Sequence, residues 1–416
     1  MQGAETVYHV IVLGGGPAGC ATALALLKHS DASFLVVDNA DPSAFKVGES
    51  LPPESSSLLR HLHPSILPRL ASGHHSPCTG NASAWATPLL EERHAIFNPF
   101  GHGLHLDRAA FDEMLRQVVI DGSPRGASAS TLIKGTFKHA EKNSSSHWSV
   151  HVDVNGISST FFSRWLVDAT GRKASVSTKL GAKTISSEPL LSFYTLYLGP
   201  SPDDTPDADT DHRTVIEATP EGWFYTALLP RLTSESAPST RLVSFHTYPT
   251  HPSARQARRS EGFLQAVHWS TTHISGLLNK HAYEPIRQSS GFPRCTAAGS
   301  SRLVPPCDLV DEGWVAVGDA ALAFDPLSSQ GMMTALEMGC YVGMALARLF
   351  NDQQDGLEES SARTRAQVAV EGMYESVWEQ YERHREYYYR LVKRFEGEEF
   401  WSAVQKPISV ESSPPM

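Results

Sequence analysis

The first 38 residues alternate between short apolar runs and glycine-rich or polar breaks, in the order expected of a βαβ unit. Val7–Leu13 is rich in β-branched residues, Cys20–Lys28 is rich in alanine and leucine, and Phe34–Val37 is a second apolar run that ends at Asp38. The two short apolar runs predict buried strands, and the longer alanine- and leucine-rich run predicts a helix between them. This unit is typical of α/β proteins with a parallel sheet.

The hydrophobic pattern changes after residue 190. Aromatic strand-like segments separated by polar loops fill 190–294, and an apolar helix then ends near residue 350. Apolar positions at helical spacing return in Val370–Phe395. We therefore predict an α/β fold with a discontinuous Rossmann-type cofactor domain (1–189 and 295–350), a β-sheet substrate domain (190–294) and a C-terminal helical segment (357–406).

A dinucleotide-binding fingerprint lies between the first strand and its helix. Gly14, Gly16 and Gly19 satisfy the pattern G-x-G-x-x-G. The first glycine permits a tight turn, the second lets backbone N–H groups approach a pyrophosphate, and the third allows close packing of helix on strand. Asp38 ends the second strand, where a carboxylate binds the adenosine ribose hydroxyls. The fingerprint alone is compatible with either NAD or FAD.

Composition and charge exclude several classes of function. The 35 Lys and Arg residues against 45 Asp and Glu residues give the chain of 416 residues a net charge of −10, which argues against nucleic-acid binding. The N-terminus has no basic region, and its apolar run ends in glycines, so we expect no integral membrane segment and a cytoplasmic location. None of the 19 histidines has HExxH spacing or a nearby cysteine pair, so we expect no metal site.

A second glycine motif narrows the choice of cofactor. A strand-like run ends at Gly318-Asp319, and Phe324–Gly331 follows as Phe-Asp-Pro-Leu-Ser-Ser-Gln-Gly before a helix. Together with the fingerprint, this resembles the FAD-dependent monooxygenase and flavin halogenase superfamily, with the fold of para-hydroxybenzoate hydroxylase. The resemblance covers nearly the whole chain and rests also on these motifs: Val47-Gly48-Glu49-Ser50, His105-Leu106-Asp107-Arg108, Phe111-Asp112 and Asp168–Arg172.

The resemblance implies an FAD cofactor and a role for several residues. It implies that Asp319 binds the ribityl chain, and that Pro326 and Gly331 flank the isoalloxazine, whose edge Gln330 is placed to hydrogen-bond. A helix N-terminus near Gly331 suits the negative charge of reduced flavin. The remaining cofactor-binding residues implied by the resemblance are Glu49, Ser50 and Arg108; for Arg108 a surface salt bridge is the alternative.

Three departures from the halogenases favour oxygenation. The halogenase motif Trp-x-Trp-x-Ile-Pro is absent, Ser328–Gly331 lacks the halogenase glutamate and threonine, and no lysine occurs between Lys46 and Lys134. Halogenases need such a lysine to carry hypohalous acid. We therefore predict a monooxygenase that transfers oxygen from O2, through C4a-hydroperoxyflavin, to a small phenolic or indolic substrate.

Two alternatives stay open, a halogenase and a flavoprotein that oxidises a tryptophan of a partner protein. The second follows from Gly222–Pro230, Asp325–Gly331 and Phe400-Trp401, which resemble a halogenase-like subgroup that includes the tryptophylquinone-maturation flavoproteins. Thr170-Gly171 stands where hydroxylases have Asp-Gly. We therefore expect the flavin to receive its electrons from NAD(P)H either directly or through a flavin reductase.

Residues that contact the substrate are harder to assign from sequence. Trp223 and Tyr225 lie in the expected substrate sheet and are placed to stack on an aromatic ring, or else they are ordinary strand positions. His102 and His105 precede Arg108 and are candidates for a general base, or else they are satisfied loop histidines. The aromatic positions of the last helix are expected to pack against the FAD domain; a surface for a partner protein is the alternative.

Overall fold

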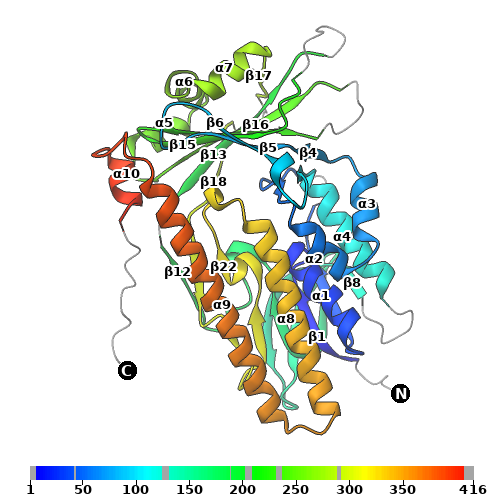
Figure 1. Cartoon of the computed structure of the whole chain (residues 1–416). Coiled ribbons are helices and arrows are strands. Elements are labelled where there is room, and N and C mark those ends of the chain that lie inside the picture. Colours follow the sequence, from blue (N-terminus) through cyan, green and yellow to red (C-terminus); the bar gives the residue numbers. More distant parts are fainter. Residues whose placement is uncertain are drawn as a thin grey trace.

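The computed structural model describes residues 6–41, 44–123, 131–187, 189–201, 209–230, 237–287 and 292–406. It has the mixed α/β architecture that the sequence predicts. One sheet and its helices form the lower part of the view in Figure 1, a second sheet lies above them, and two long helices run along one side.

The lower sheet is mainly parallel and brings several strand ends to one edge. β1 lies between β11 and β2 and runs parallel to both, and β21 and β8 extend this parallel order on either side. Leu13, Asp38 and Asp168 therefore end at the same edge, where cofactors bind in such sheets. The strands in spatial order are β20 (Cys307–Asp308), β21 (Trp314–Ala316), β11 (Ile157–Asp168), β1 (Val7–Leu13), β2 (Phe34–Asp38) and β8 (Thr131–Lys134).

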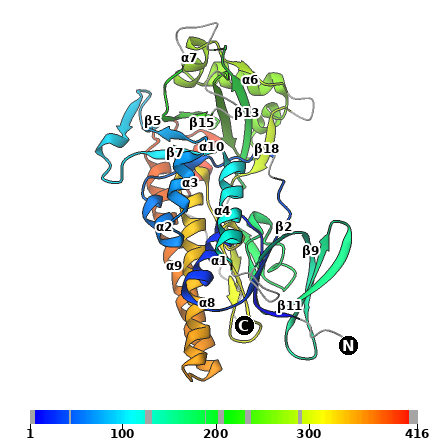
Figure 2. The ribbon, with the colours of Figure 1, turned by 90° about the vertical axis from the view of Figure 1, so that its right-hand side faces the viewer.

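A hairpin of β9 (Thr136–Lys142) and β10 (Trp148–Val154) continues this sheet. β10 pairs antiparallel with β11, and β9 pairs antiparallel with β10. Figure 2 shows the hairpin on the opposite side of the sheet from the long helices.

Two helices that are far apart in the sequence pack against each other beside the parallel sheet. α1 (Pro17–His29) and α8 (Gly331–Gln354) approach closely because α8 presents glycines to α1. A Cβ at Gly339 would lie 2.2 Å from the carbonyl oxygen of Ala18, and one at Gly343 would lie 2.6 Å from that of Thr22. Both helices begin at the edge where the strands end, so their N-termini face the same space.

The upper sheet has one face toward the lower domain and one face covered by helices. Along β15, Phe224 packs into the core beneath the helices, whereas Trp223 and Tyr225 face the other way, as strand alternation requires. The strands in spatial order are β17 (Glu284–Pro285), β13 (Leu191–Leu198), β16 (Thr240–Thr247), β15 (Gly222–Leu229), β14 (Thr214–Thr219), β5 (Gly80–Ala84) and β6 (Glu91–His94), and β18 (Arg294–Ala297) pairs with β13. The covering helices are α5 (Pro252–Ala257), α6 (Ser260–Ser270) and α7 (His273–Lys280).

The upper sheet extends beyond the predicted substrate segment 190–294. β5 pairs in parallel with β14, and β6 pairs with β5. Residues 80–94 therefore contribute strands that the hydrophobic pattern of the N-terminal third did not reveal. The division into three domains stays a prediction.

Shorter elements join the two layers. β3 (Ser50–Leu51), β7 (Gly103–His105) and β4 (Ser76–Cys78) form a small sheet that leads into α4 (Arg108–Gly122). A second small sheet contains β12 (Lys183–Ser186), β19 (Ser301–Val304) and β22 (Leu322–Ala323). The remaining N-terminal helices are α2 (Ser55–Leu62) and α3 (Ile66–Ser72).

The C-terminal helices pack against both layers. α9 (Glu359–Arg390) runs beside α8, and Tyr374, Trp378 and Tyr381 join the core of the lower domain. α10 (Glu399–Val404) places Phe400 and Trp401 in a cluster under the upper sheet. These aromatic side chains thus pack on the rest of the chain, whereas Tyr387 and Tyr388 of α9 are exposed.

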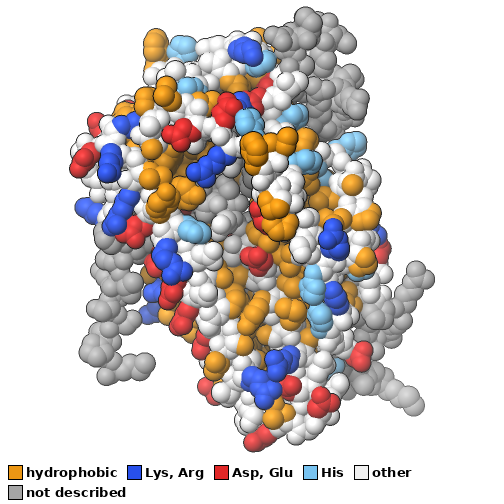
Figure 3. All heavy atoms as spheres, in the orientation of Figure 1, with side chains coloured by type: hydrophobic (Ala, Val, Ile, Leu, Met, Phe, Trp, Pro, Cys, Tyr) orange, Lys and Arg blue, Asp and Glu red, His pale blue; other side chains and the backbone are white. Residues whose placement is uncertain are grey.

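The surface carries charges of both signs. Figure 3 shows acidic and basic side chains interspersed over the face it displays. Among the described residues, no helix combines the length and the apolar character needed to cross a bilayer.

Candidate active site

A cavity of about 950 Å³ lies where the edge of the parallel sheet faces the upper sheet. Most of the site residues predicted from sequence line it: Gly14, Gly16, Asp38, Glu49, Ser50, Arg108, Trp223, Tyr225, Asp319, Pro326 and Gly331. Gly19, Gln330, His102 and His105 are not among the lining residues.

The glycine fingerprint has the geometry that its spacing predicts. Gly14 has φ +115°, and a Cβ there would lie 2.1 Å from the carbonyl oxygen of Ala169. A Cβ at Gly19 would lie 1.9 Å from the carbonyl oxygen of Gly14, so the helix could not pack on the turn. Gly16 is different, because no atom lies within 4 Å of the Cβ position and the backbone opens onto the cavity. The turn leaves room for a phosphate to reach the N-terminus of α1.

Asp38 lies at the end of β2, where a ribose-binding carboxylate is expected. Its Oδ2 pairs with Nη1 of Arg116 at 3.1 Å, and the same guanidinium donates to the carbonyl oxygen of Gly15 at 3.3 Å. Arg116 is buried on α4 and also pairs with Glu113. It therefore fixes both the acid and the glycine turn. Sequence analysis missed Arg116 because no motif marks it.

Arg108 connects α4 to the Gly48-Glu49 turn. Its Nη1 donates to the carbonyl oxygens of Val47 at 3.2 Å and Gly48 at 2.9 Å, and its Nη2 pairs with Asp112 at 3.3 Å. The Nε of Arg108 is buried and has no hydrogen-bond partner within the described parts of the chain. Arg108 is thus a half-buried side chain that lines the cavity, pairs with Asp112 and keeps one N–H donor without a partner in the described parts of the chain.

Asp319 lines the cavity directly after Gly318, whose Cβ position lies 2.8 Å from Cβ of Ala18 in α1. Its carboxylate faces the guanidinium of Arg172, with an Nε–Oδ2 distance of 3.5 Å. Burial raises the pKa of the Asp319 carboxyl, whereas the charges of Arg172 and Arg108 act in the opposite direction. Arg172 also donates to the carbonyl oxygens of Gly299 and Phe324, and so holds the loop that carries Asp319.

The N-terminus of α8 forms another wall. Pro326 and Gly331 line the cavity, and no side chain caps the first turn of α8. Gln330 is exposed and lies outside the set of lining residues, so the structure does not support its predicted hydrogen bond to the isoalloxazine. The reason is local: Gln330 is the N-cap of α8, directly after Ser329 at φ +50°, and this turn carries its side chain to the surface.

A buried pair of polar side chains joins the lower domain to the upper sheet. Glu49 is 3% exposed, and its carboxyl accepts a hydrogen bond from the hydroxyl of Tyr225. Burial raises the pKa of Glu49, although hydrogen bonds from the backbone and from Tyr225 and the charge of Arg108 lower it in part. Burial also raises the pKa of Tyr225 well above its usual value. Glu49 is therefore a carboxyl whose proton affinity is increased at the cavity.

A Glu49→Gln variant is expected to be more stable than the wild type at about pH 8, and the difference should shrink towards about pH 4. Because the pKa of Glu49 is raised in the folded state, the folded chain binds this proton more strongly than the unfolded chain. Its contribution to stability is therefore present below the unfolded pKa and is lost as pH rises through the folded pKa. Gln removes the ionisation and keeps an acceptor for Tyr225.

The measurement is the thermal unfolding midpoint of both proteins across that pH range. Glu91→Gln on exposed β6 is the control and should change little at any pH. A Glu49→Gln midpoint that stays parallel to the wild type at every pH would contradict the assignment.

The upper sheet provides an aromatic wall. Trp223 stacks on His246 with ring centroids 3.8 Å apart, and its Nε1 donates to the hydroxyl of Tyr389 at 3.0 Å. Burial lowers the pKa of His246 to about 3, so the stacked imidazole is neutral. The hydroxyl of Tyr389 in turn donates to Asp325 at 2.6 Å. Sequence analysis did not assign these residues: Asp325 lies in the Phe324–Gly331 motif but was given no role, and His246 and Tyr389 come from distant segments.

The two histidines proposed as general bases have other surroundings. His105 is buried, its Nδ1–H donates to the carbonyl oxygen of Leu228 at 3.1 Å, and its Nε2 accepts from Thr214 at 3.1 Å. Burial lowers its pKa to about 4. His102 is exposed, and its Nδ1 lies 3.0 Å from the carbonyl oxygen of Gly103. Because neither histidine lines the cavity, the geometry gives no support to their predicted catalytic role.

The cavity fits an FAD molecule in several independent respects. The helices α1 and α8 both present uncapped N-termini to it, which suits the pyrophosphate and the anionic edge of a reduced flavin. Open space lies at the Cβ positions of Gly16 and Gly331. The buried Nε–H of Arg108 is a hydrogen-bond donor that has no acceptor in the described parts of the chain. Asp38 and Asp319 both line the cavity, so their carboxylates can accept hydrogen bonds from cofactor hydroxyls, as the sequence predicts.

Comparison with known proteins agrees with this geometry. No protein-family model matches the chain. It is 27% identical over 402 residues to a protein of Marinomonas mediterranea named as an FAD-dependent oxidoreductase, LodB, and the match covers 95% of this chain and 96% of LodB. The chain is therefore similar to FAD-dependent oxidoreductases of the halogenase-like kind.

Solved structures show the same fold. The myxobacterial chondrochloren halogenase CndH matches with a TM-score of 0.77 and 19% identity, covering 98% of this chain and 87% of CndH. The peptidyl tryptophan dihydroxylase QhpG is essential for tryptophylquinone cofactor biogenesis. It matches with a TM-score of 0.65 and 19% identity, covering 98% of this chain and 80% of QhpG. The predicted fold class is thus confirmed, and the similarity to the FAD-dependent oxidoreductase LodB supports the predicted FAD cofactor.

Proposed function

We propose that this FAD-dependent oxidoreductase is a monooxygenase that uses O2 to oxygenate an electron-rich aromatic substrate, phenolic or indolic. The observation that carries the proposal is the substrate side of the cavity, which is walled by aromatic and small polar side chains and holds no lysine among the described residues. The upper sheet contributes Ser192, Thr214, Ile216, Trp223, Tyr225, His246, Thr296, Ala297 and Ala298.

The two lysines that do line the cavity are placed elsewhere. Lys46 is paired with Asp112 at 2.9 Å, beside Arg108, and Lys173 is exposed in the loop after β11. Neither belongs to the aromatic wall, on the side of the cavity where we place the substrate. This supports oxygenation over halogenation.

Bound FAD would supply the electrons and the activated oxygen. The chain's own residues position the substrate and handle its proton. Trp223 and Tyr225 offer faces on which an aromatic ring can stack. We assign proton transfer to Tyr225 and Glu49, because the Tyr225 hydroxyl already donates to a carboxyl whose pKa burial has raised.

A specific surface feature favours a tryptophan within a partner protein as a second candidate substrate. Between β5 and β7, four large apolar side chains are exposed: Leu89 at 73%, Ile96 at 85%, Phe97 at 87% and Phe100 at 56%. Exposed apolar clusters mark protein interaction sites. This segment leads directly into β7, which pairs with Ser50 of the cavity wall. QhpG, whose name gives a peptide-bound tryptophan as its substrate, shares the fold.

The experiment is a product analysis by mass spectrometry. Holoenzyme receives O2, chloride or bromide, and either free indoles and phenols or a tryptophan-containing protein. Electrons come from a flavin reductase with NADH or, in parallel, from NADPH alone. We expect a mass increase of about 16 or 32 Da, one or two oxygen atoms, and no halogenated product. A brominated product would overturn the proposal, and activity on the protein alone would favour the second candidate.

A further inference from the structure

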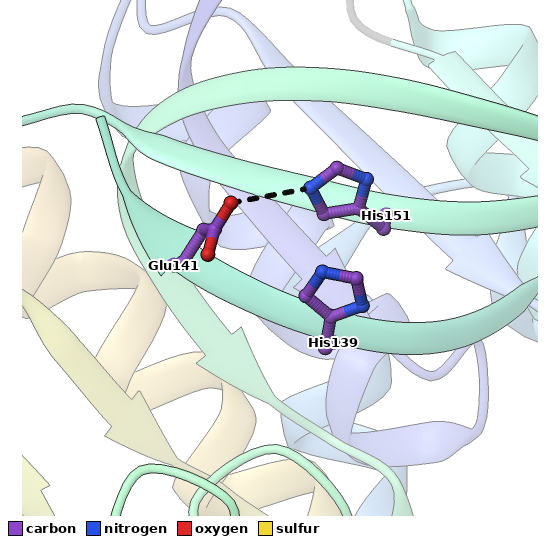
Figure 4. Close-up of side chains that lie close together, drawn as sticks. All are labelled: His139, Glu141 and His151. Carbon is purple, nitrogen blue, oxygen red and sulfur yellow. Dashed lines mark ion pairs between the residues drawn. The ribbon is translucent and has the colours of Figure 1, made fainter. Parts of the chain in front are cut away.

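The β9–β10 hairpin carries a cluster of three side chains with no part in the site described above. Figure 4 shows the imidazoles of His139 and His151 and the carboxylate of Glu141 turned toward one another. His139 and Glu141 are two residues apart on β9 and so share one face, and His151 is the direct cross-strand partner of His139. One ligand atom from each residue lies within 4.8 Å of the other two.

We propose that His139, Glu141 and His151 bind a divalent transition-metal ion, with Zn²⁺ as the representative. Imidazole nitrogen and carboxylate oxygen are the usual protein ligands of such ions. The two imidazole rings already stack with centroids 4.1 Å apart and an interplanar angle of 14°. Tetrahedral coordination at about 2.0–2.1 Å needs ligand atoms about 3.4 Å apart, which small rotations of these partly exposed side chains provide.

The hydrogen bonding of His151 prepares one nitrogen for a cation. Its Nδ1 lies 3.1 Å from the hydroxyl oxygen of Thr160 on β11. When Nδ1–H donates to that hydroxyl, the lone pair on Nε2 is free. That Nε2 is buried, makes no hydrogen bond within the described parts of the chain, and lies 3.8 Å from Oε1 of Glu141. A cation between Nε2 and the carboxylate would satisfy both groups.

The position of the cluster defines what the ion would do. It would join β9 to β10 with three protein ligands and leave a fourth position to water, because His139 and Glu141 are exposed. Residues 136 and 137, at the start of β9, line the FAD cavity next to Asp38. The ion would therefore tie together a hairpin that contacts the cofactor, while lying outside the cavity itself.

The test is a Zn²⁺ titration of the holoenzyme in competition with a chromogenic chelator. We expect the wild type to bind one more Zn²⁺ per chain than a His139→Ala/His151→Ala double variant, and Zn²⁺ to raise the unfolding temperature of the wild type alone. Thr160→Val, which removes the partner of Nδ1, should weaken binding about 10-fold.

His94→Ala is the matched control, since His94 forms a surface pair with Glu92 at 3.0 Å but belongs to no cluster of three ligands among the described residues. It should bind Zn²⁺ as the wild type does. All variants should keep the wild-type flavin spectrum, which shows that they are folded. Equal stoichiometry and affinity in the wild type and the double variant would overturn the proposal, as would an equal loss in His94→Ala.

Discussion

A Gly16→Val variant is expected to fold and to lose its FAD. Gly16 has φ −78° and ψ −174°, an extended conformation that valine adopts without strain. No atom lies within 4 Å of its Cβ position, so the added side chain would meet no protein atom and would instead occupy the space that the pyrophosphate needs. Each lost N–H contact to an anion costs about 1.5–3 kcal/mol, so we expect the Kd for FAD to rise roughly 10- to 150-fold.

The measurements are flavin content after reconstitution and thermal unfolding of the FAD-free proteins. Gly276→Val is the control, because Gly276 in α7 also has no atom within 4 Å of its Cβ position but lies on the far side of the upper sheet. The FAD-free forms of both variants should unfold near the wild-type temperature. If Gly16→Val keeps the wild-type affinity for FAD, the pyrophosphate does not lie at this turn.

How much of the site the sequence predicts depends on whether the residues are contiguous. Gly14, Gly16, Gly19 and Asp38 belong to one βαβ unit whose geometry is local, and the structure has close contacts at Gly14 and Gly19 and open space at Gly16. Asp319 was assigned through the family resemblance, which covers the second glycine motif. Both sets rely on short-range patterns that a single sequence displays.

The remaining site residues depend on long-range packing that no local pattern shows. Arg116 reaches Asp38 only because α4 packs on α1 and on β8, the neighbour of β2, and Tyr225 meets Glu49 only because the upper sheet lies near the β3 turn. His246 enters the site as the cross-strand partner of Trp223. Each contact joins residues that are between 23 and 176 positions apart in the chain. The sequence therefore shows that these residue types are present, but it does not show that they contact one another.

The cluster of His139, Glu141 and His151 also depends on long-range pairing that motif spacing does not show. Metal-binding motifs such as HExxH contain only ligands that are close in sequence. His139 and His151 instead come together because β9 pairs with β10. A signal was present: a histidine and an acid two residues apart on one strand, followed by a short turn and a histidine on the next. Alternation along a predicted hairpin would have placed all three on one face.

Trp401→Ala is expected to reduce the free energy of unfolding by about 3–5 kcal/mol, the usual cost of removing a fully buried tryptophan. Trp401 is 0% exposed, and its ring lies 5.5 Å from that of Trp85, centroid to centroid. Its Nε1 donates to the carbonyl oxygen of Thr219 at 2.8 Å, at the end of β14 and directly before the turn into Trp223. The variant would leave a cavity and an unpaired carbonyl beneath the aromatic wall of the site.

The matched control is Trp269→Ala, because Trp269 is 78% exposed on α6 and its loss should change stability by no more than about 0.5 kcal/mol. Urea unfolding followed by circular dichroism measures both variants. Since Tyr389 lies in the same cluster and connects Trp223 to Asp325, Trp401→Ala should also weaken FAD binding. If Trp401→Ala instead behaves like Trp269→Ala, α10 does not support the upper sheet.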